Sequence, residues 1–220
     1  MRRFKMIVVA VMALAAITAM TAAAAVAEPG FLPKSNFIGK GTGGKLVTTN
    51  KGTIECGGVN ILSGVMETDS HGTADIHYEK CKAFGLFAAK SLGDASETIL
   101  APGSVWLLCL IEPKTLVWGL WVEVNPASPV HVEAGGKLVE VKGGIIGKIT
   151  ENKKSLTKKL EFKQKASLSD PSECTGTDGK VKKANQLTQE DGKAPETSAL
   201  EGNATVEAED KKTEMEIMDA

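Results

Sequence analysis

The chain is short of aromatic side chains, of histidine and of arginine. Only 5% of its 220 residues are aromatic, three are histidine, and arginine stands only at Arg2 and Arg3. Without arginine and interleaved aromatic residues, we expect no nucleic-acid partner. Few large rings also predict a core built mainly from valine, isoleucine, leucine and alanine. The overall balance, 42% hydrophobic and 24% charged with a net charge of −1, excludes collagen-like, wholly disordered and multi-span membrane chains.

The N-terminal segment differs from the rest of the chain. Residues 1–27 contain three basic residues, no acidic residue and an apolar run that closes on Ala25-Val26-Ala27. This order is typical of a secretory signal peptide, with a helix across its apolar run. The alternative is an uncleaved anchor, since about 22 residues could span a bilayer. We expect cleavage after Ala27, a secreted or extracellular protein, and membrane contact only if the leader stays uncleaved.

Charge is segregated along residues 28–220. Residues 28–136 have eight lysines and eleven acidic residues, a net charge of −3. Residues 137–183 have twelve lysines and six acidic residues, net +6, and residues 184–220 have three lysines and ten acidic residues, net −7. The basic block is either a patch for an anionic cell-envelope polymer or a set of strands that pair with the acidic block across a sheet. We favour the second interpretation.

Four cysteines remain after the leader: Cys56, Cys81, Cys109 and Cys174. Their even number in an oxidising compartment predicts two disulfides, for which three pairings are possible. We favour Cys56–Cys81, because a strand, a turn and a strand between them would bring their ends together, and this leaves Cys109–Cys174. A metal site is the weaker alternative, since the chain has no CxxC pair. A buried free thiol at Cys109 is another.

Alternation of apolar and polar residues dominates the chain after the leader, and it predicts many short strands. The expected strands are residues 45–49, 53–56, 60–68, 74–80, 105–111, 116–124, 130–134, 137–142, 144–149, 158–164, 205–209 and 214–218. Strands of this length with frequent turns predict one all-β domain over 28–220, an antiparallel sandwich or a barrel-like fold. Residues 82–92 read equally as a short helix or a loop, and the polar segment 168–201 as a long loop.

Motifs for catalysis are weak. Gly39-Lys40-Gly41-Thr42-Gly43-Gly44-Lys45 fits a phosphate loop in outline, but Leu46 stands where serine or threonine must hold magnesium. Asp75, His77 and Glu79 would share one face of a strand, which is an acid–base cluster, a weak metal site or simply a solvated face. We favour the solvated face, and expect no catalytic residue, no metal site and no cofactor.

Tryptophan marks the two most apolar segments. Trp106 lies in the first, and Trp118 and Trp121 lie in the second, three residues apart and so on opposite faces of a regular strand. These three side chains are candidates for an apolar ligand pocket inside a barrel. The alternative is that they fill an ordinary core.

A family resemblance rests on four short segments, most of them C-terminal to Val130. They are Val-His-Val-Glu at 130–133, Gly-Gly-Ile-Ile-Gly-Lys-Ile-Thr at 143–150, Leu-Glu-Phe-Lys-Gln at 160–164, and Thr-Val-Glu at 205–207. This pattern resembles a group of uncharacterised exported proteins of Gram-positive soil bacteria. The resemblance implies secretion and β structure, and it carries no assigned activity.

Three functions remain open at this point. The first is a secreted or envelope-associated, non-catalytic β-sandwich protein with a binding or structural role and an unknown partner. The second is a barrel-type carrier of an apolar small molecule, and the third is an extracellular hydrolase. A cavity on the order of a few hundred cubic ångströms lined by tryptophan would favour the carrier. A cleft that gathers His77 or His131 with an acid and a hydroxyl would favour the hydrolase.

Overall fold

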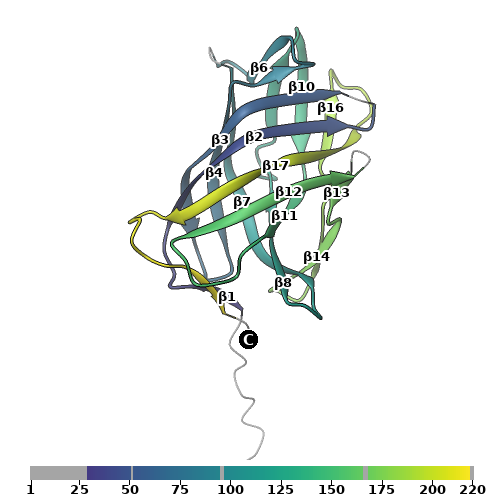
Figure 1. Cartoon of the computed structure of the whole chain (residues 1–220). Helices are drawn as coiled ribbons and strands as arrows, with labels where there is room; N and C mark the ends of the chain where they lie inside the picture. Colours follow the sequence, from purple (N-terminus) through teal and green to yellow (C-terminus); the bar gives the residue numbers. More distant parts are fainter. Residues whose placement is uncertain (1–28, 51, 95–96, 166–167, 219–220) are drawn as a thin grey trace, which may run out of the picture.

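The computed structural model describes residues 29–218, except 51, 95–96 and 166–167. The expected leader and its helix, residues 1–27, lie outside this part. Within it every regular element is a β-strand (Figure 1). None of the described residues forms a helix of the length and apolar character needed to cross a membrane.

The strands come in close succession along the chain. In order they are β1 (Gly30–Leu32), β2 (Phe37–Thr48), β3 (Thr53–Met66), β4 (His71–Glu79), β5 (Lys82–Ala83), β6 (Phe87–Ser91), β7 (Thr98–Glu112), β8 (Val117–Glu123), β9 (Val130–Ala134), β10 (Lys137–Lys142), β11 (Gly144–Ile149), β12 (Thr157–Lys165), β13 (Leu168–Asp170), β14 (Glu173–Gly176), β15 (Val181–Lys183), β16 (Leu187–Glu190), β17 (Glu196–Ala208) and β18 (Glu216–Met218).

One large antiparallel sheet closes on itself twice. Its hydrogen-bonding order is β13-β12-β11-β8-β7-β4-β3-β2-β17-β16-β10-β9-β6-β5. An added β12–β17 pairing closes a first ring of β2, β3, β4, β7, β8, β11, β12 and β17. An added β3–β5 pairing closes a second ring of β2, β3, β5, β6, β9, β10, β16 and β17. The all-β, antiparallel prediction is confirmed, and the closure corresponds to its barrel-like alternative.

Three long strands, β2, β3 and β17, belong to both rings and join them end to end. The β17–β2 register shifts between Gly202 and Thr205. Gly43, on the β2 side of this region, has a φ of +62°, which a side chain would strain. Such irregularities increase the local twist of a sheet. Figure 1 shows the outcome, with β6, β10 and β16 at one end of the molecule and β1 at the other.

Glycines in the strands make room for the few aromatic rings. A Cβ at Gly64 would lie 2.3 Å from the ring of Phe37, and a Cβ at Gly147 would lie 2.6 Å from the ring of Phe162. Each ring therefore lies across a glycine of the neighbouring strand, and this covers backbone that glycine leaves bare. At these two positions glycine is what allows the aromatic ring to pack flat on the neighbouring strand.

The far end of the first ring is plugged. β1 and β18 form a separate two-stranded sheet there, and their Phe31 and Ile217 are buried in the first core cluster. The ring of Trp106 packs edge-on against those of Phe31 and Phe37, with centroids 6.2 and 5.6 Å apart. Edge-to-face contacts of this kind add to the free energy gained from burial.

The second ring has its own core cluster, built from smaller side chains. Cys81, Ala83, Ala89 and Val132 are each at most 2% exposed, and no ring is fully buried among them. A third, small cluster lies outside the first ring and centres on Cys109, Ile146 and Cys174.

Two segments differ from their sequence predictions. Residues 82–92 contain the β5–β6 hairpin, because Ala83 and Ala89 alternate into the second cluster while residues 84–88 lie exposed at its turn. Residues 168–201 are not one long loop: they contain β13 to β16 and the start of β17. Alternation is still at work there, since β14 buries Cys174 and Gly176 between exposed neighbours.

The basic and acidic blocks of the sequence are neighbours in the sheet. The lysine-rich β10 and β12 pair with β16 and β17 of the acidic block. Lys137 forms an ion pair with Glu190, and Lys154 lies 3.7 Å from Glu214. The predicted pairing of the two blocks in one sheet is therefore present, but other lysines of the basic block, such as Lys142 and Lys163, form ion pairs with acids of their own block.

Candidate ligand-binding interior

The rings enclose two adjoining cavities, of about 70 and 60 Å³. The first extends into the second ring between Ile54, Ile99 and Val132, and the other extends into the first ring toward Trp106 and Leu160. They adjoin because they share a set of lining residues from β2, β4, β8, β11 and β17. These are Gly44, Ile76, Tyr78, Val122, Ile145 and Leu200. The described residues that line the two cavities include no charged side chain.

A third cavity, of about 100 Å³, lies at the open end of the second ring. It shares Leu46 and Ile54 with the cavity below it, so the three form a series along the interior. Its rim is polar: the amine groups of Lys137 and Lys193 both lie on Glu190, the second at 2.9 Å. This end is therefore the mouth of the interior, opposite the plug made by β1 and β18.

Tyr78 stands at the junction of the two inner cavities. It is the only tyrosine of the chain, and its side chain packs against both the first and the second core cluster. Among the described residues no group hydrogen-bonds its hydroxyl. Burial alone raises the pKa of Tyr78 to about 12. The hydroxyl is therefore a neutral donor that faces interior space without a partner.

Two further polar groups line the upper cavity. Ser104 donates its hydroxyl to the carbonyl oxygen of Ala101 at 3.0 Å. Gln186 is 7% exposed, and its Oε1 has no hydrogen-bond partner. One of the two groups is thus already satisfied and the other is not.

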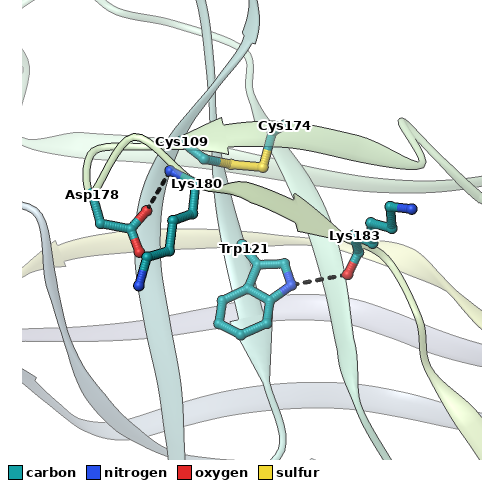
Figure 2. The surroundings of a disulfide bond; sticks show 6 residues. All are labelled: Cys109, Trp121, Cys174, Asp178, Lys180 and Lys183. Atoms are coloured by element: carbon teal, nitrogen blue, oxygen red, sulfur yellow. Dashed lines mark hydrogen bonds between the residues drawn. A yellow bond between two sulfur atoms is a disulfide. The ribbon is translucent and has the colours of Figure 1, made fainter.

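The three tryptophans of the predicted pocket are placed differently from one another. Trp106 lines the lower cavity. Trp118 is buried in the first cluster and is not among the lining residues. Trp121 lies on the outer side of the first ring, where its Nε1 donates to the carbonyl of Lys183 at 3.1 Å (Figure 2). The amine of Lys182 lies 5.2 Å from the centroid of the Trp121 indole, so β15 covers the indole on the side that faces away from the strand ring.

Both disulfides of the structure join the pairs that the sequence favoured. Cys56–Cys81 links β3 to the residue before β5, with Cα atoms 3.9 Å apart. Cys109–Cys174 fixes β14 to the outer side of β7, with Cα atoms 5.7 Å apart (Figure 2). Cys56 also lines the upper cavity, so the first bond belongs to the interior and the second to the outer cluster.

The titratable residues singled out from the sequence lie on different parts of the molecule. His71 contacts Thr68 at 2.6 Å, and His131 lies 3.2 Å from Glu140 on the next strand. On β4, Asp75 accepts the backbone N–H of Gly103. Glu79, farther along the same strand, accepts from Asn60 instead, and His77 lies half-buried between the two. Within the described residues, no group of His, Cys, Asp and Glu is arranged to hold a metal ion.

An open groove of about 410 Å³ runs over the outer face of β2, β3 and β17. The glycine-rich segment 39–45 contributes to it as part of β2, not as a loop before a helix. Asn203 accepts hydrogen bonds from the backbone and hydroxyl of Thr42, at 3.3 and 3.2 Å, so polar side chains of the groove already satisfy one another.

Comparisons with known proteins give no relative: no protein-family model, no curated protein and no solved structure matches the chain. The resemblance to exported proteins of Gram-positive soil bacteria therefore stays a prediction. The candidate site rests on geometry alone. Sequence reasoning did not single out Tyr78, although a signal was present. If Asp75, His77 and Glu79 face water, then Ile76 and Tyr78 face the opposite way, into the core.

Proposed function

We propose that this is an exported, non-catalytic binding protein whose ring interior holds one small apolar molecule. The observation that carries the proposal is the pair of adjoining cavities, of about 70 and 60 Å³, inside a closed ring of strands. An apolar cavity of roughly 150 Å³ stays dry and takes up a benzene-sized ligand. The two lobes together approach that size. They are smaller than a carrier of large lipids needs, so the proposed ligand is about one ring or a short chain.

The path and the compartment fit this proposal. The mouth cavity adjoins the inner ones through Leu46 and Ile54, which gives an apolar molecule a route from solvent. Two disulfides are consistent with an oxidising compartment outside the cytosol. Because the lining includes no acid, base or charged side chain beyond the phenol of Tyr78, the interior favours binding over chemistry.

Equilibrium dialysis with p-xylene tests the proposal. We expect saturable binding of one molecule per chain. Ala101 lines the upper cavity and is 6% exposed, so Ala101→Leu fills the site and weakens binding at least about tenfold. Ala88→Leu adds the same volume at an exposed position of β6 and leaves binding unchanged. Ala101→Val serves if the larger side chain prevents folding. No saturable binding by the native chain, or equal binding by the filled variants, would overturn the proposal.

A further inference from the structure

We infer that the ligand carries one uncharged hydrogen-bonding oxygen, and that this oxygen meets the hydroxyl of Tyr78. The inference rests on the proposed function and names the ligand class for the same site. Three observations support it: the position of Tyr78 at the junction of both cavities, its unpartnered hydroxyl, and the absence of charge from the described lining.

The position of the side chain follows from the sheet. Tyr78 pairs in register with Val59 of β3 and with Ile99 of β7, whose side chains belong to the first and second clusters respectively. Gly44 lies two strands away, on the far side of β3, and it has no side chain that would press on the Tyr78 ring. A Cβ built there would lie 3.4 Å from that ring. The ring is therefore held between the two lobes, and any molecule that occupies both of them passes it.

The hydroxyl has no partner among the described residues, and its oxygen is accessible, since it does not belong to the fully buried unpartnered polar atoms. A ligand oxygen that reaches it gains a hydrogen bond in apolar surroundings, where such a bond is stronger than in water. Burial also raises the pKa of Tyr78 to about 12, so the group stays a donor throughout the physiological range. Its natural partner is an acceptor oxygen on the ligand.

The lining sets the charge of that ligand. A carboxylate or an ammonium inside either lobe would be buried without a counter-ion, which is strongly unfavourable. Neutral alcohols, phenols and ketones carry no such penalty. Among these, a hydroxyl group both accepts and donates, so it suits a lining that offers unpartnered donors, at Tyr78 and at Nε1 of Trp106, and an unpartnered acceptor, at Oε1 of Gln186.

The test compares p-cresol with p-xylene, two ligands of nearly equal shape that differ by a hydroxyl. Dissociation constants of both are measured for the native chain and for Tyr78→Phe, which removes only the hydroxyl. We expect the preference for p-cresol over p-xylene to fall at least about fivefold in Tyr78→Phe, with the p-xylene affinity nearly unchanged. Taking the ratio of the two ligands cancels the difference in their own hydration.

Ser198→Ala is the matched control, because it removes a buried hydroxyl of β17 that also has no partner but lines none of the three cavities. Its ligand preference should stay within about twofold of the native one. If Tyr78→Phe fails to fold, the native chain labelled with ¹³Cζ-tyrosine gives one resonance, which p-cresol should shift more than p-xylene does. Saturable binding of both ligands with an unchanged preference, or equal resonance shifts, overturns the inference and leaves the proposed function standing. Binding of neither ligand overturns both.

Discussion

The two ends of the ring interior are built from different side chains. At the plugged end Phe31, Phe37 and Trp106 pack ring against ring beneath the β1–β18 sheet. At the open end the second cluster consists of alanine, valine, isoleucine and cysteine, and Phe84 and Phe87 there are exposed. The larger buried aromatic side chains thus lie at the plugged end, and the side chains buried inside the second ring are small. Two cavities occupy the second ring, and a third reaches through the first ring to Phe37 and Trp106.

The largest change in the free energy of unfolding should come from removing the disulfides. Cys56–Cys81 lies on the inner side of the sheet and Cys109–Cys174 on its outer side. Loop-closure entropy predicts a loss of about 4 kcal/mol for Cys109→Ala/Cys174→Ala, whose bond spans 65 residues. It predicts about 3.5 kcal/mol for Cys56→Ala/Cys81→Ala, whose bond spans 25. Urea unfolding measures both. Only Cys56→Ala/Cys81→Ala should also weaken p-xylene binding, since Cys56 lines the upper cavity. Weaker binding in Cys109→Ala/Cys174→Ala alone would contradict the assignment of one bond to the interior and the other to the outer cluster.

A matched pair of alanines tests the packing difference directly. Ala208, 1% exposed on β17 opposite Phe37, belongs to the plugged end, whereas Ala101 lines the upper cavity. Ala208→Val should lose about 2 kcal/mol of unfolding free energy through overpacking. Ala101→Val should be neutral or stabilising by up to about 1 kcal/mol, because its added methyl groups enter existing space. Equal losses in thermal or urea unfolding would show that the open end is as tightly packed as the plug.

Tyr78, at the boundary between the two ends, should make the free energy of unfolding depend on pH. Its pKa of about 12 in the folded chain lies above the ordinary value of 10, so the unfolded chain loses this proton first. The stability that the neutral phenol contributes is complete below pH 10 and falls as the pH rises toward 12. Native stability should therefore drop by about 1 kcal/mol more than that of Tyr78→Phe between pH 9 and 11. Parallel urea curves for the two chains at both pH values would contradict the buried position.

The smallest effect concerns the one buried charge of the plugged end. Lys158 is 1% exposed and donates to the carbonyl of Lys153. Burial lowers its pKa, and attraction to Glu216 and Glu151 opposes that change. Since the cation is disfavoured in the folded chain, Lys158→Met should gain about 1 kcal/mol at pH 7.

This gain should shrink as the pH rises to the ordinary lysine value of 10.5, where the unfolded chain also loses the proton. Chemical denaturation at pH 7 and at pH 10.5 measures the difference. A loss of stability at pH 7 would mean that the hydrogen bond to Lys153 and the attraction to Glu216 stabilise the amine more than burial destabilises it.

Strand content and cysteine pairing followed from local pattern, whereas closure did not. The alternation of Leu160 and Phe162 with lysine and glutamate is enough to predict β12. Nothing in that pattern tells which strand it pairs with, and β12–β17 joins residues that lie about forty positions apart, such as Leu160 and Ala204. Ring closure is a property of the whole sheet and its twist, so a single strand carries no signal of it.

The candidate site shows the same limit. The sequence drew attention to tryptophans because they are large and apolar, and of these only Trp106 lines a cavity. Spacing did separate Trp118 from Trp121, which lie on opposite sides of β8 as the alternation predicted. Residues 82–92 read equally as a short helix or a loop, yet they form the β5–β6 hairpin, with Phe84 exposed in its turn and Phe87 exposed on β6. Empty space depends on how volumes add up across eight strands, and no residue pattern records that sum.

A crystal structure determined under xenon pressure tests the central claim most directly, because xenon enters apolar cavities without needing a hydrogen bond. We expect xenon inside the ring, in the lobes on either side of Tyr78, and none between Phe31 and Ile217 beneath the β1–β18 sheet. An interior without xenon, or xenon packed between Phe31 and Ile217, would contradict the claim.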